Sequence, residues 1–194
     1  QRNSAIKQRK DFGPGWDIEL AVTGNQVTHL REIYLDSLLE SFEFISRDYF
    51  EPGLVELNWK RGWSSELSLE EAITGNLLKD RERGFTQVGP HRADLEVRFK
   101  GQVASQSASR GQQKLLISVL HLAQASLIKK LTDSNPLILI DDLASELDNE
   151  NRDKLVSGLL DIECQVFITG TDEIPGLVKN QKMFHVEHGL FTEQ

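Results

Sequence analysis

The apolar residues of the N-terminal part recur at the spacing of an α-helix. Between residues 16 and 47 they follow one another at intervals of seven, three, four and four positions, which places them on one helical face. These residues are Leu20, Val27, Leu30, Tyr34 and Leu38. Gly24 falls inside the segment and weakens a helix, so the pattern predicts either a helical hairpin or one long, kinked helix.

The segment from residue 55 to residue 101 combines two strand patterns with one short helix. Apolar and polar residues alternate twice, as is typical of half-buried strands. The apolar members are Val55, Leu57 and Trp59 in the first strand and Leu95, Val97 and Phe99 in the second. Between the strands, Ser68 and Glu71 have the spacing of a capping box, which predicts a helix over residues 69–82 that ends near Gly84.

After about residue 85 a long helix and a buried strand dominate the pattern. A loop over residues 105–110 leads into an amphipathic helix. Its apolar face comprises Leu116, Val119, Leu120, Ala123, Leu127 and Leu131. The uninterrupted apolar run over residues 137–140 predicts a strand that is buried on both faces, as in a parallel sheet covered by helices.

A further helix is predicted over residues 149–160, with short strands over residues 166–168 and 184–187. Alternating strands and helices indicate an α/β fold for this part. We therefore expect two domains, a helical arm with a short strand segment over residues 1–84 and an α/β lobe over residues 85–194.

The composition is that of a folded protein. The 194 residues are 39% hydrophobic and 27% charged, unlike the balance of a disordered chain. One cysteine excludes an internal disulfide. No apolar run approaches the ~20 residues that cross a bilayer and no signal segment opens the chain, so we expect a cytoplasmic protein with no membrane partner. The net charge of −8 argues against binding nucleic acid by bulk charge but not by a local basic patch.

Two adjacent carboxylates, Asp141 and Asp142, follow the apolar strand directly. Ligands of open α/β sheets bind beyond the carboxyl ends of the strands, which is where this strand places both acids. In P-loop nucleotide hydrolases the first such acid holds Mg²⁺ and the second positions or activates the attacking water. The alternative is a pair of solvated acids in an ordinary turn.

The stretch from Ser107 to Lys114, ahead of the long helix, has the composition of an anion site. Small hydroxyl residues and Gly111 stand at a helix start, where unsatisfied N–H groups and the positive end of the dipole favour a phosphate. An ordinary N-cap is the alternative for such a turn taken alone. Its place before a helix, a buried strand and paired acids favours the anion site.

Three stretches resemble the RecF family of bacterial recombination and repair ATPases, which is part of the ATP-binding-cassette (ABC) superclass. They are Gly89–Leu95, Ser107–Lys114 and Ile140–Asp148, in the order that the family has them. The last two match the signature motif and the Walker B strand with its D-loop, and residues 1–85 are a weaker match. The resemblance implies a P-loop, ABC-type ATPase head, of which this chain holds the C-terminal part of lobe I together with a mostly helical second domain.

The phosphate-binding Walker A loop, G-x-x-x-x-G-K-[ST], does not occur in the sequence. In the RecF family this loop lies near the N-terminus, and this chain begins with Gln1 rather than Met. We therefore expect the C-terminal portion of a larger ATPase. On its own, that portion is expected to bind ATP weakly or not at all and to be inactive.

The resemblance also implies which residues contact ATP, which would lie between two protomers. Ser109, Gly111 and Gln112 would contact the γ-phosphate from across the dimer interface. Ser107 and Arg110 would be neighbours of that contact.

The resemblance assigns the catalytic acids as well. Asp141 would associate with Mg²⁺, and Asp142 would be the general base or the water-orienting acid. Most members of the superclass have Glu at that second place, so slow hydrolysis is expected. Ser145 and Asp148 would belong to the D-loop, although Asp148 is also suited to cap the next helix. Transporter-type cassettes place a switch histidine after the next strand, where this sequence has Thr169–Thr171, whose hydroxyls are candidates for contacting phosphate through water.

Basic residues provide candidates for contacting DNA. They are Arg2, Lys7, Arg9, Lys10, Lys60, Arg61, His91 and Arg92, with further cations over residues 79–83. A solvated cation on a helix face is the alternative for any one of them. Binding to a phosphate backbone requires several of them on one surface.

The function implied is an ATP-driven dimer that clamps double-stranded and gapped DNA and releases it on slow hydrolysis. The family acts in recombinational repair and replication restart, where it helps to load RecA with RecO and RecR. One alternative is the C-terminal head of an SMC-like chromosome or break-repair ATPase, but a long heptad coiled coil would then precede the signature motif. The other is a non-enzymatic interaction module whose acids are structural caps.

Overall fold

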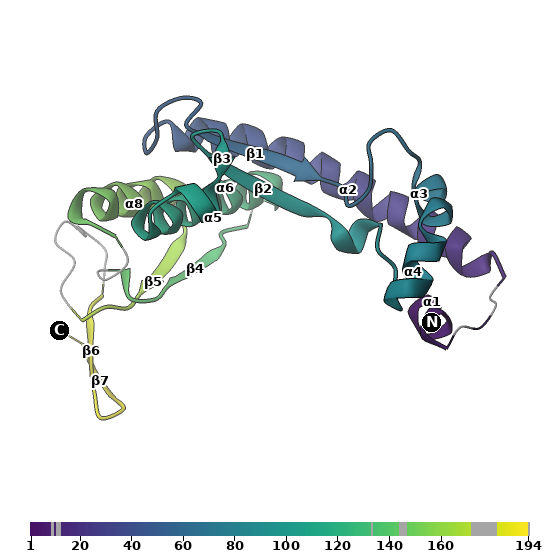
Figure 1. Cartoon of the computed structure of the whole chain (residues 1–194). Helices are drawn as coiled ribbons and strands as arrows, with labels where there is room; N and C mark the ends of the chain where they lie inside the picture. Colours follow the sequence, from purple (N-terminus) through teal and green to yellow (C-terminus); the bar gives the residue numbers. More distant parts are fainter. Residues whose placement is uncertain (9, 11–12, 133, 144–146, 172–181, 194) are drawn as a thin grey trace. The chain divides into compact units, whose positions relative to one another are not determined.

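The computed structural model describes residues 1–8, 10, 13–132, 134–143, 147–171 and 182–193 (Figure 1). It comprises two compact units, Gln1–Ser109 and Arg110–Gln194. The units divide later than the expected boundary at residues 84 and 85. The reason is that residues 94–99 pair with residues 55–60 in one sheet, which ties the segment before Ser109 to the first unit.

The first unit combines helices with a small antiparallel sheet. Its helices are α1 (Arg2–Lys7), α2 (Gly15–Ser46), α3 (Leu69–Gly75), α4 (Leu77–Arg83), the 3₁₀ helix η1 (Pro90–Arg92) and α5 (Ala104–Ser107). Its strands are β1 (Val55–Lys60), β2 (Asp94–Phe99) and β3 (Gln102–Val103), in the order β1-β2-β3. The predicted alternation is confirmed, because Leu57 and Trp59 are half-buried and lie opposite Val97 and Leu95.

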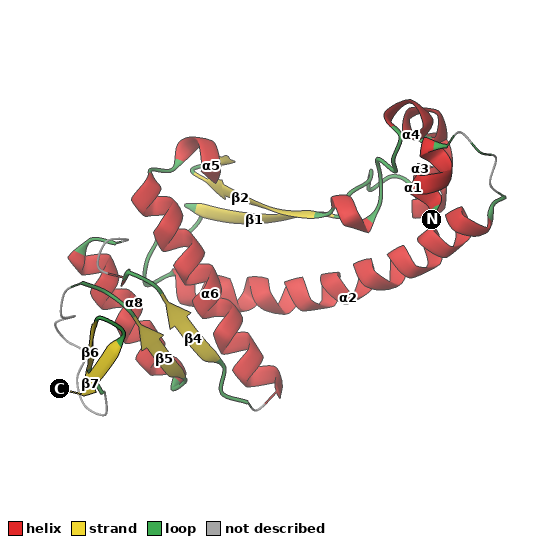
Figure 2. Ribbon diagram, turned by 90° about the horizontal axis from the view of Figure 1, so that it is seen from below, coloured by secondary structure: helices red, strands yellow, loops and turns green. Residues whose placement is uncertain are grey.

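Helix α2 is one continuous helix rather than a hairpin (Figure 2). Gly24 lies buried inside it, where other parts of the chain approach closely. A Cβ atom there would lie 2.6 Å from Leu69 Cδ2 and 3.3 Å from Pro90 Cγ. The glycine therefore does not interrupt the helix but allows α3 and η1 to pack against it.

The helix predicted over residues 69–82 is divided into α3 and α4 at Asn76. The capping box is present, since Ser68 Oγ accepts the Glu71 N–H (3.1 Å) and Glu71 Oε2 accepts the Ser68 N–H (2.8 Å). The Asn76 side chain donates to the Ala72 carbonyl (2.8 Å), which ends α3 early. Gly84, at φ +79°, ends α4 as predicted.

The second unit contains a parallel strand pair and a hairpin. Its elements are α6 (Arg110–Thr132), β4 (Leu137–Ile140), α8 (Asn149–Ile162), β5 (Gln165–Ile168), β6 (Phe184–Glu187) and β7 (Leu190–Glu193). Strands β4 and β5 are parallel with α8 as the crossover, which is the predicted α/β arrangement, and β6 pairs with β7 in antiparallel fashion.

Helices α6 and α8 contact each other and lie on the same side of the β4–β5 pair (Figure 1). The prediction that β4 is buried on both faces is wrong, because Leu137 and Leu139 of β4 are 56% and 72% exposed. On α6, Leu116 and Val119 are buried as predicted, whereas Leu131 is 62% exposed. By length and composition α6 also passes as a membrane-spanning helix, but its buried residues pack as in the core helix of a folded domain.

Candidate functional site

The candidate site lies where the parallel strands β4 and β5 end. Ile140 and Ile168 are partners in the ladder, so the residues after them, Asp141 and Thr169, leave the sheet side by side. The Thr169 hydroxyl donates a hydrogen bond to Asp141 Oδ1 (2.5 Å) and accepts one from the Asp142 N–H (2.9 Å). One hydroxyl group therefore orients both the side chain of the first acid and the backbone of the second.

Asp142 adopts a left-handed backbone conformation, with φ at +48°. This conformation costs an L-residue about 1–2 kcal/mol, so the surroundings must hold it in place. Its N–H binds the Thr169 hydroxyl, and the next N–H, that of Leu143, donates to the Thr169 carbonyl (3.2 Å). Leu143 is fully buried and anchors the turn. The turn leaves the Asp141 carboxylate exposed and that of Asp142 half-buried.

Asp148 is the N-cap of α8. Its Oδ1 accepts the Asn151 N–H (2.9 Å) and its Oδ2 accepts the Asn151 side-chain amide (2.8 Å). These hydrogen bonds favour the ionised form, first of all the one from the Asn151 backbone, and so lower the pKa of Asp148 below its ordinary value. Of the two roles expected for Asp148, the structure contains the helix cap. Ser145, the other expected D-loop residue, lies outside the described residues.

The predicted signature stretch is divided between the two units. Ser107 belongs to α5, and its hydroxyl lies 3.2 Å from the Phe99 carbonyl and 3.1 Å from the Val103 carbonyl. That hydroxyl therefore binds the backbone of the first unit, and the expectation that Ser107 neighbours a phosphate contact stays a prediction. Ser109 and Gly111 are exposed at the start of α6, and a Cβ atom at Gly111 would meet no atom within 4 Å.

Arg110 opens α6 and is exposed, and Gln112 lies in its first turn, half-buried. The first turn of a 23-residue helix thus begins with small or flexible side chains. Backbone N–H groups at the start of a helix are the kind of donor that binds anions. The role of these residues toward a phosphate stays a prediction.

A groove of about 580 Å³ runs between α6, β4 and α8 in the second unit. Its lining is mostly apolar, and it includes Asp141 together with Lys114 from the second turn of α6. The candidate acid thus lies at a hollow of the surface rather than on a flat face.

The side chains at this site fit a magnesium ion that is held together with a phosphate ligand. Among the described residues, no group of three His, Cys, Asp or Glu side chains is arranged to hold a metal ion. Asp141 offers one exposed carboxylate, oriented by Thr169. Because Mg²⁺ commonly takes one or two carboxylates and completes its shell with waters and substrate phosphates, this donor set suits it.

Arg2 is buried inside the first unit, at 7% exposure. Its Nε donates to Asp17 Oδ1 (2.6 Å), and its Nη1 donates to Asp80 Oδ2 (2.8 Å) and Thr86 Oγ1 (2.6 Å). These ion pairs and this burial engage Arg2 inside the first unit, and a contact of Arg2 with DNA stays a prediction. No local pattern predicts these partners, because Asp80 and Thr86 are 78 and 84 positions away.

Two other candidates for contacting DNA are paired with acids. Lys60 forms an ion pair with Glu96, and Arg61 forms one with Glu32 at 3.4 Å. By contrast, Lys7, Lys10 and Arg92 are exposed, and Arg9 lies outside the described residues.

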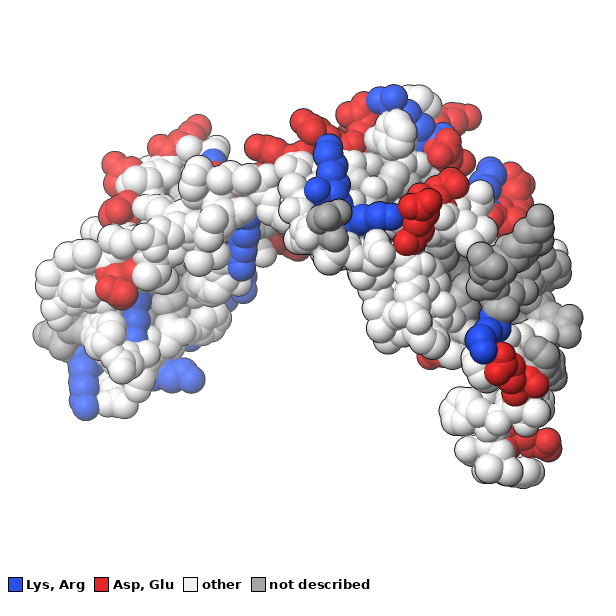
Figure 3. Space-filling model, turned by 180° about the vertical axis from the view of Figure 1, so that it is seen from behind, with Lys and Arg blue, Asp and Glu red and all other residues white. Residues whose placement is uncertain are grey.

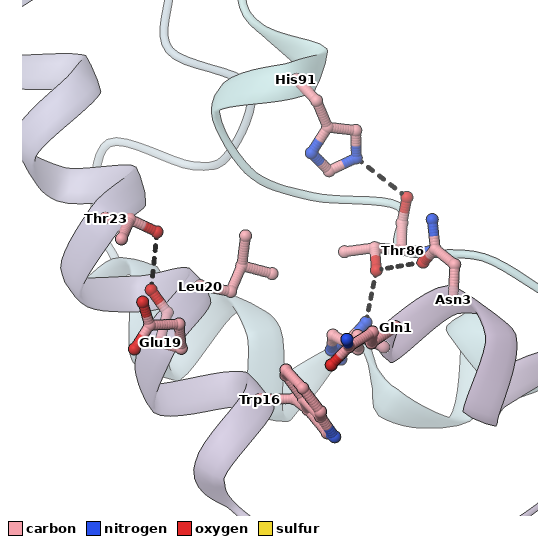
Figure 4. Close-up of a pocket in the computed structure, with 9 residues that line it drawn as sticks. Gln1, Asn3, Trp16, Glu19, Leu20, Thr23, Thr86 and His91 are labelled. Atoms are coloured by element: carbon pink, nitrogen blue, oxygen red, sulfur yellow. Dashed lines mark hydrogen bonds between the residues drawn. The ribbon is translucent and has the colours of Figure 1, made fainter.

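His91 faces a pocket of about 370 Å³ in the first unit (Figure 4). Its Nε2 lies 3.1 Å from the Thr86 carbonyl, and the Thr86 hydroxyl lies 2.7 Å from Asn3 Oδ1. Trp16 of α2 lines the same pocket. The ring of His91 therefore binds the main chain of its own unit, and a contact of His91 with DNA stays a prediction.

Comparison with known proteins gives a consistent set of relatives, although no family model matches the chain. The DNA replication and repair protein RecF of Pseudomonas paraeruginosa is 38% identical over 204 residues, which covers all of this chain and 54% of that protein. RecF of Thioalkalivibrio sulfidiphilus is 37% identical over 194 residues, 97% of this chain and 54% of that protein. RecF of Shewanella halifaxensis is 37% identical over 200 residues, 99% of this chain and 54% of that protein.

Solved structures agree on the fold. The structure described as the recombination mediator protein RecF-ATP in the RecFOR pathway matches with a TM-score of 0.79 at 24% identity, over all of this chain and 54% of that one. The corresponding RecF-ATPrS structure matches with a TM-score of 0.77. The chain thus spans about half the length of the relatives that it matches, and the predicted ABC ATPase type of fold is confirmed.

Proposed function

Because this chain is similar over its whole length to the C-terminal portion of RecF, we propose that it forms the C-terminal part of an ATP-dependent DNA-binding protein of DNA replication and repair. In this proposal ATP drives two copies together on double-stranded or gapped DNA, and slow hydrolysis releases them. The reaction takes place in the cytoplasm. The dimer helps RecO and RecR to load RecA at gaps.

The observation that carries the proposal is the pair of acids at the end of β4, held by Thr169. Carboxyl ends of parallel strands are where α/β folds bind their ligands. A solvated turn would not require the strained backbone of Asp142 to be fixed by two hydrogen bonds from neighbouring N–H groups to one threonine. The name of a matching structure includes ATP, which supports a nucleotide as the ligand of that relative.

The chain's own residues have separable tasks in this proposal. Thr169 fixes the direction of the Asp141 carboxylate, whose second oxygen is left for a cation. A bound Mg²⁺ would neutralise charge on the phosphates. Asp142 accepts a proton from the attacking water or orients that water, and the start of α6 offers N–H groups to the phosphate of the partner protomer.

The proposal is tested in a chimera in which the part of Pseudomonas RecF that this chain does not match is fused ahead of it. The chimera should hydrolyse ATP in a Mg²⁺-dependent way, whereas the 194-residue chain alone should not. Asp142→Asn should abolish turnover while ATP-driven dimers persist in analytical ultracentrifugation. Asp161→Asn, an acid exposed on α8, is the matched control. Equal turnover by both variants would remove Asp142 from the mechanism.

A further inference from the structure

Some cations of the first unit are paired with acids, whereas others are not. Lys60 is exposed and Arg61 is half-buried, and both are paired with acids. Lys7, Lys10, Lys79 and Arg83 are also exposed, and no acid in the described part of the chain pairs with them. We call these last four residues the basic end. Figure 3 shows Lys and Arg side chains along the lower edge of this end of the first unit.

The fold brings the four residues together from distant parts of the sequence. The hydrogen bond from Arg2 to Asp80 fastens α1 against α4. At the other end of α1, the side chain of Lys7 passes beside Gly84, with its Cγ 3.6 Å from where a Cβ would stand.

Local geometry relates the remaining members of the basic end to their neighbours. Lys79 and Arg83 are four positions apart on α4 and therefore share one face. The Lys10 N–H donates to the Ala5 carbonyl (3.1 Å), which folds the chain back over the end of α1.

We propose that the basic end binds the phosphate backbone of DNA. The inference rests on the proposed function and locates its DNA contact. Four cations stand there against one exposed acid of α4, Glu82, in a chain whose net charge is −8. Such a concentration of unpaired charge costs electrostatic energy unless an anionic partner relieves it. Lysine and arginine on exposed helix faces are point contacts for phosphates and read no base sequence.

Salt dependence measures the number of phosphate contacts. Each one contributes about 0.9 to the slope of log affinity against log salt concentration for duplex DNA. Three contacts thus account for about 2.7 of the slope, equivalent to a change of about 40-fold in affinity between 50 and 200 mM salt.

The experiment follows a short fluorescein-labelled DNA duplex by anisotropy, with the 194-residue chain and no nucleotide, over a series of NaCl concentrations. The triple variant Lys7→Ala, Lys79→Ala, Arg83→Ala should lower the slope by about 2.7. The control Lys100→Ala, Lys130→Ala, Lys182→Ala removes the same charge elsewhere and should leave the slope nearly unchanged. Glu82→Gln should tighten binding.

Equal slopes for the two triple variants would show that bulk charge alone matters and would overturn the inference. So would a basic-end variant that binds like the unmodified chain. Circular dichroism checks that all variants fold, as expected because the changed side chains are exposed. The anisotropy measurement needs no ATP, so its result is independent of the ATPase test of the proposed function. ATP hydrolysis by the chimera without a contribution of the basic end to DNA binding would overturn only this inference. DNA binding by the basic end without ATP hydrolysis by the chimera would overturn only the proposed ATPase activity.

Discussion

The buried ion pair between Arg2 and Asp80 is expected to make the first unit sensitive to the loss of either partner. Asp80 is 0% exposed and accepts two hydrogen bonds, one from Arg2 Nη1 (2.8 Å) and one from the Gln87 N–H (2.8 Å). Arg2→Met removes the only one of these two donors that carries charge. Leaving a buried charge without its partner costs about 3–5 kcal/mol, so the free energy of unfolding should fall by about that amount.

The reverse change is expected to be milder. Asp80→Asn leaves the Arg2 guanidinium with Asp17, whose side chain is 26% exposed and therefore keeps part of its hydration. We expect a loss of about 2–3 kcal/mol, since the remaining partner still compensates the buried charge. The double variant should lose less than the sum of the two single losses, because both remove the same interaction.

Tryptophan fluorescence during urea unfolding measures these effects. The three tryptophans, Trp16, Trp59 and Trp63, all lie in the first unit, so the signal reports on that unit alone. The control Arg47→Met breaks an exposed ion pair with Glu43 and should cost only about 0.3–0.5 kcal/mol. If Arg2→Met shifts the urea midpoint no more than Arg47→Met does, leaving Asp80 unpaired carries no measurable cost and the reasoning is refuted.

Three further outcomes are expected. In the chimera, Thr169→Val should raise the Mg²⁺ concentration needed for half-maximal activity by about 10-fold or more, because the hydroxyl orients Asp141. Thr169→Ser keeps the hydroxyl and should retain the original Mg²⁺ dependence, whereas an unchanged Mg²⁺ dependence in Thr169→Val would exclude this role. The cap lowers the pKa of Asp148 below its ordinary value of 3.8, so its stabilising effect is fully present above that pH and is lost as the pH falls through the lowered pKa. Thermal melts should therefore show that acidification lowers the melting temperature less in Asp148→Ala than in the unmodified chain. Gly24→Ala should destabilise the first unit by about 1–3 kcal/mol in urea, because the new Cβ would lie 2.6 Å from Leu69 Cδ2, and a neutral effect would mean that α3 can move away.

Local patterns in the sequence predicted local structure well. The capping box at Ser68 and Glu71 and the apolar strand that ends at Ile140 are both recognisable, because the residues that define them are neighbours in sequence. The division of the predicted helix at Asn76 was missed, because it depends on one side-chain amide that competes with helix propagation.

Features built from distant residues were harder to predict. The pairing of Arg2 with Asp80 joins two short helices across 78 positions, and nothing in either helix alone distinguishes this arginine from a solvated one. The sequence indicates Thr169 as a candidate for contacting phosphate through water, whereas its hydrogen bond to Asp141 appears only in the fold. Because Thr169 and Asp141 each follow a strand of a parallel pair, the topology once known places them side by side.

The uncovered face of the β4–β5 pair has a practical consequence for work with this chain. Parallel sheets normally have both faces covered, yet Leu137, Leu139 and Phe167 of this pair are more than half exposed. Such an apolar surface next to a strand edge favours association between copies, so concentrated preparations should form soluble oligomers before they precipitate. Replacing Leu139 with lysine interrupts that surface at its most exposed residue and offers a route to a better-behaved sample for crystallisation or NMR spectroscopy.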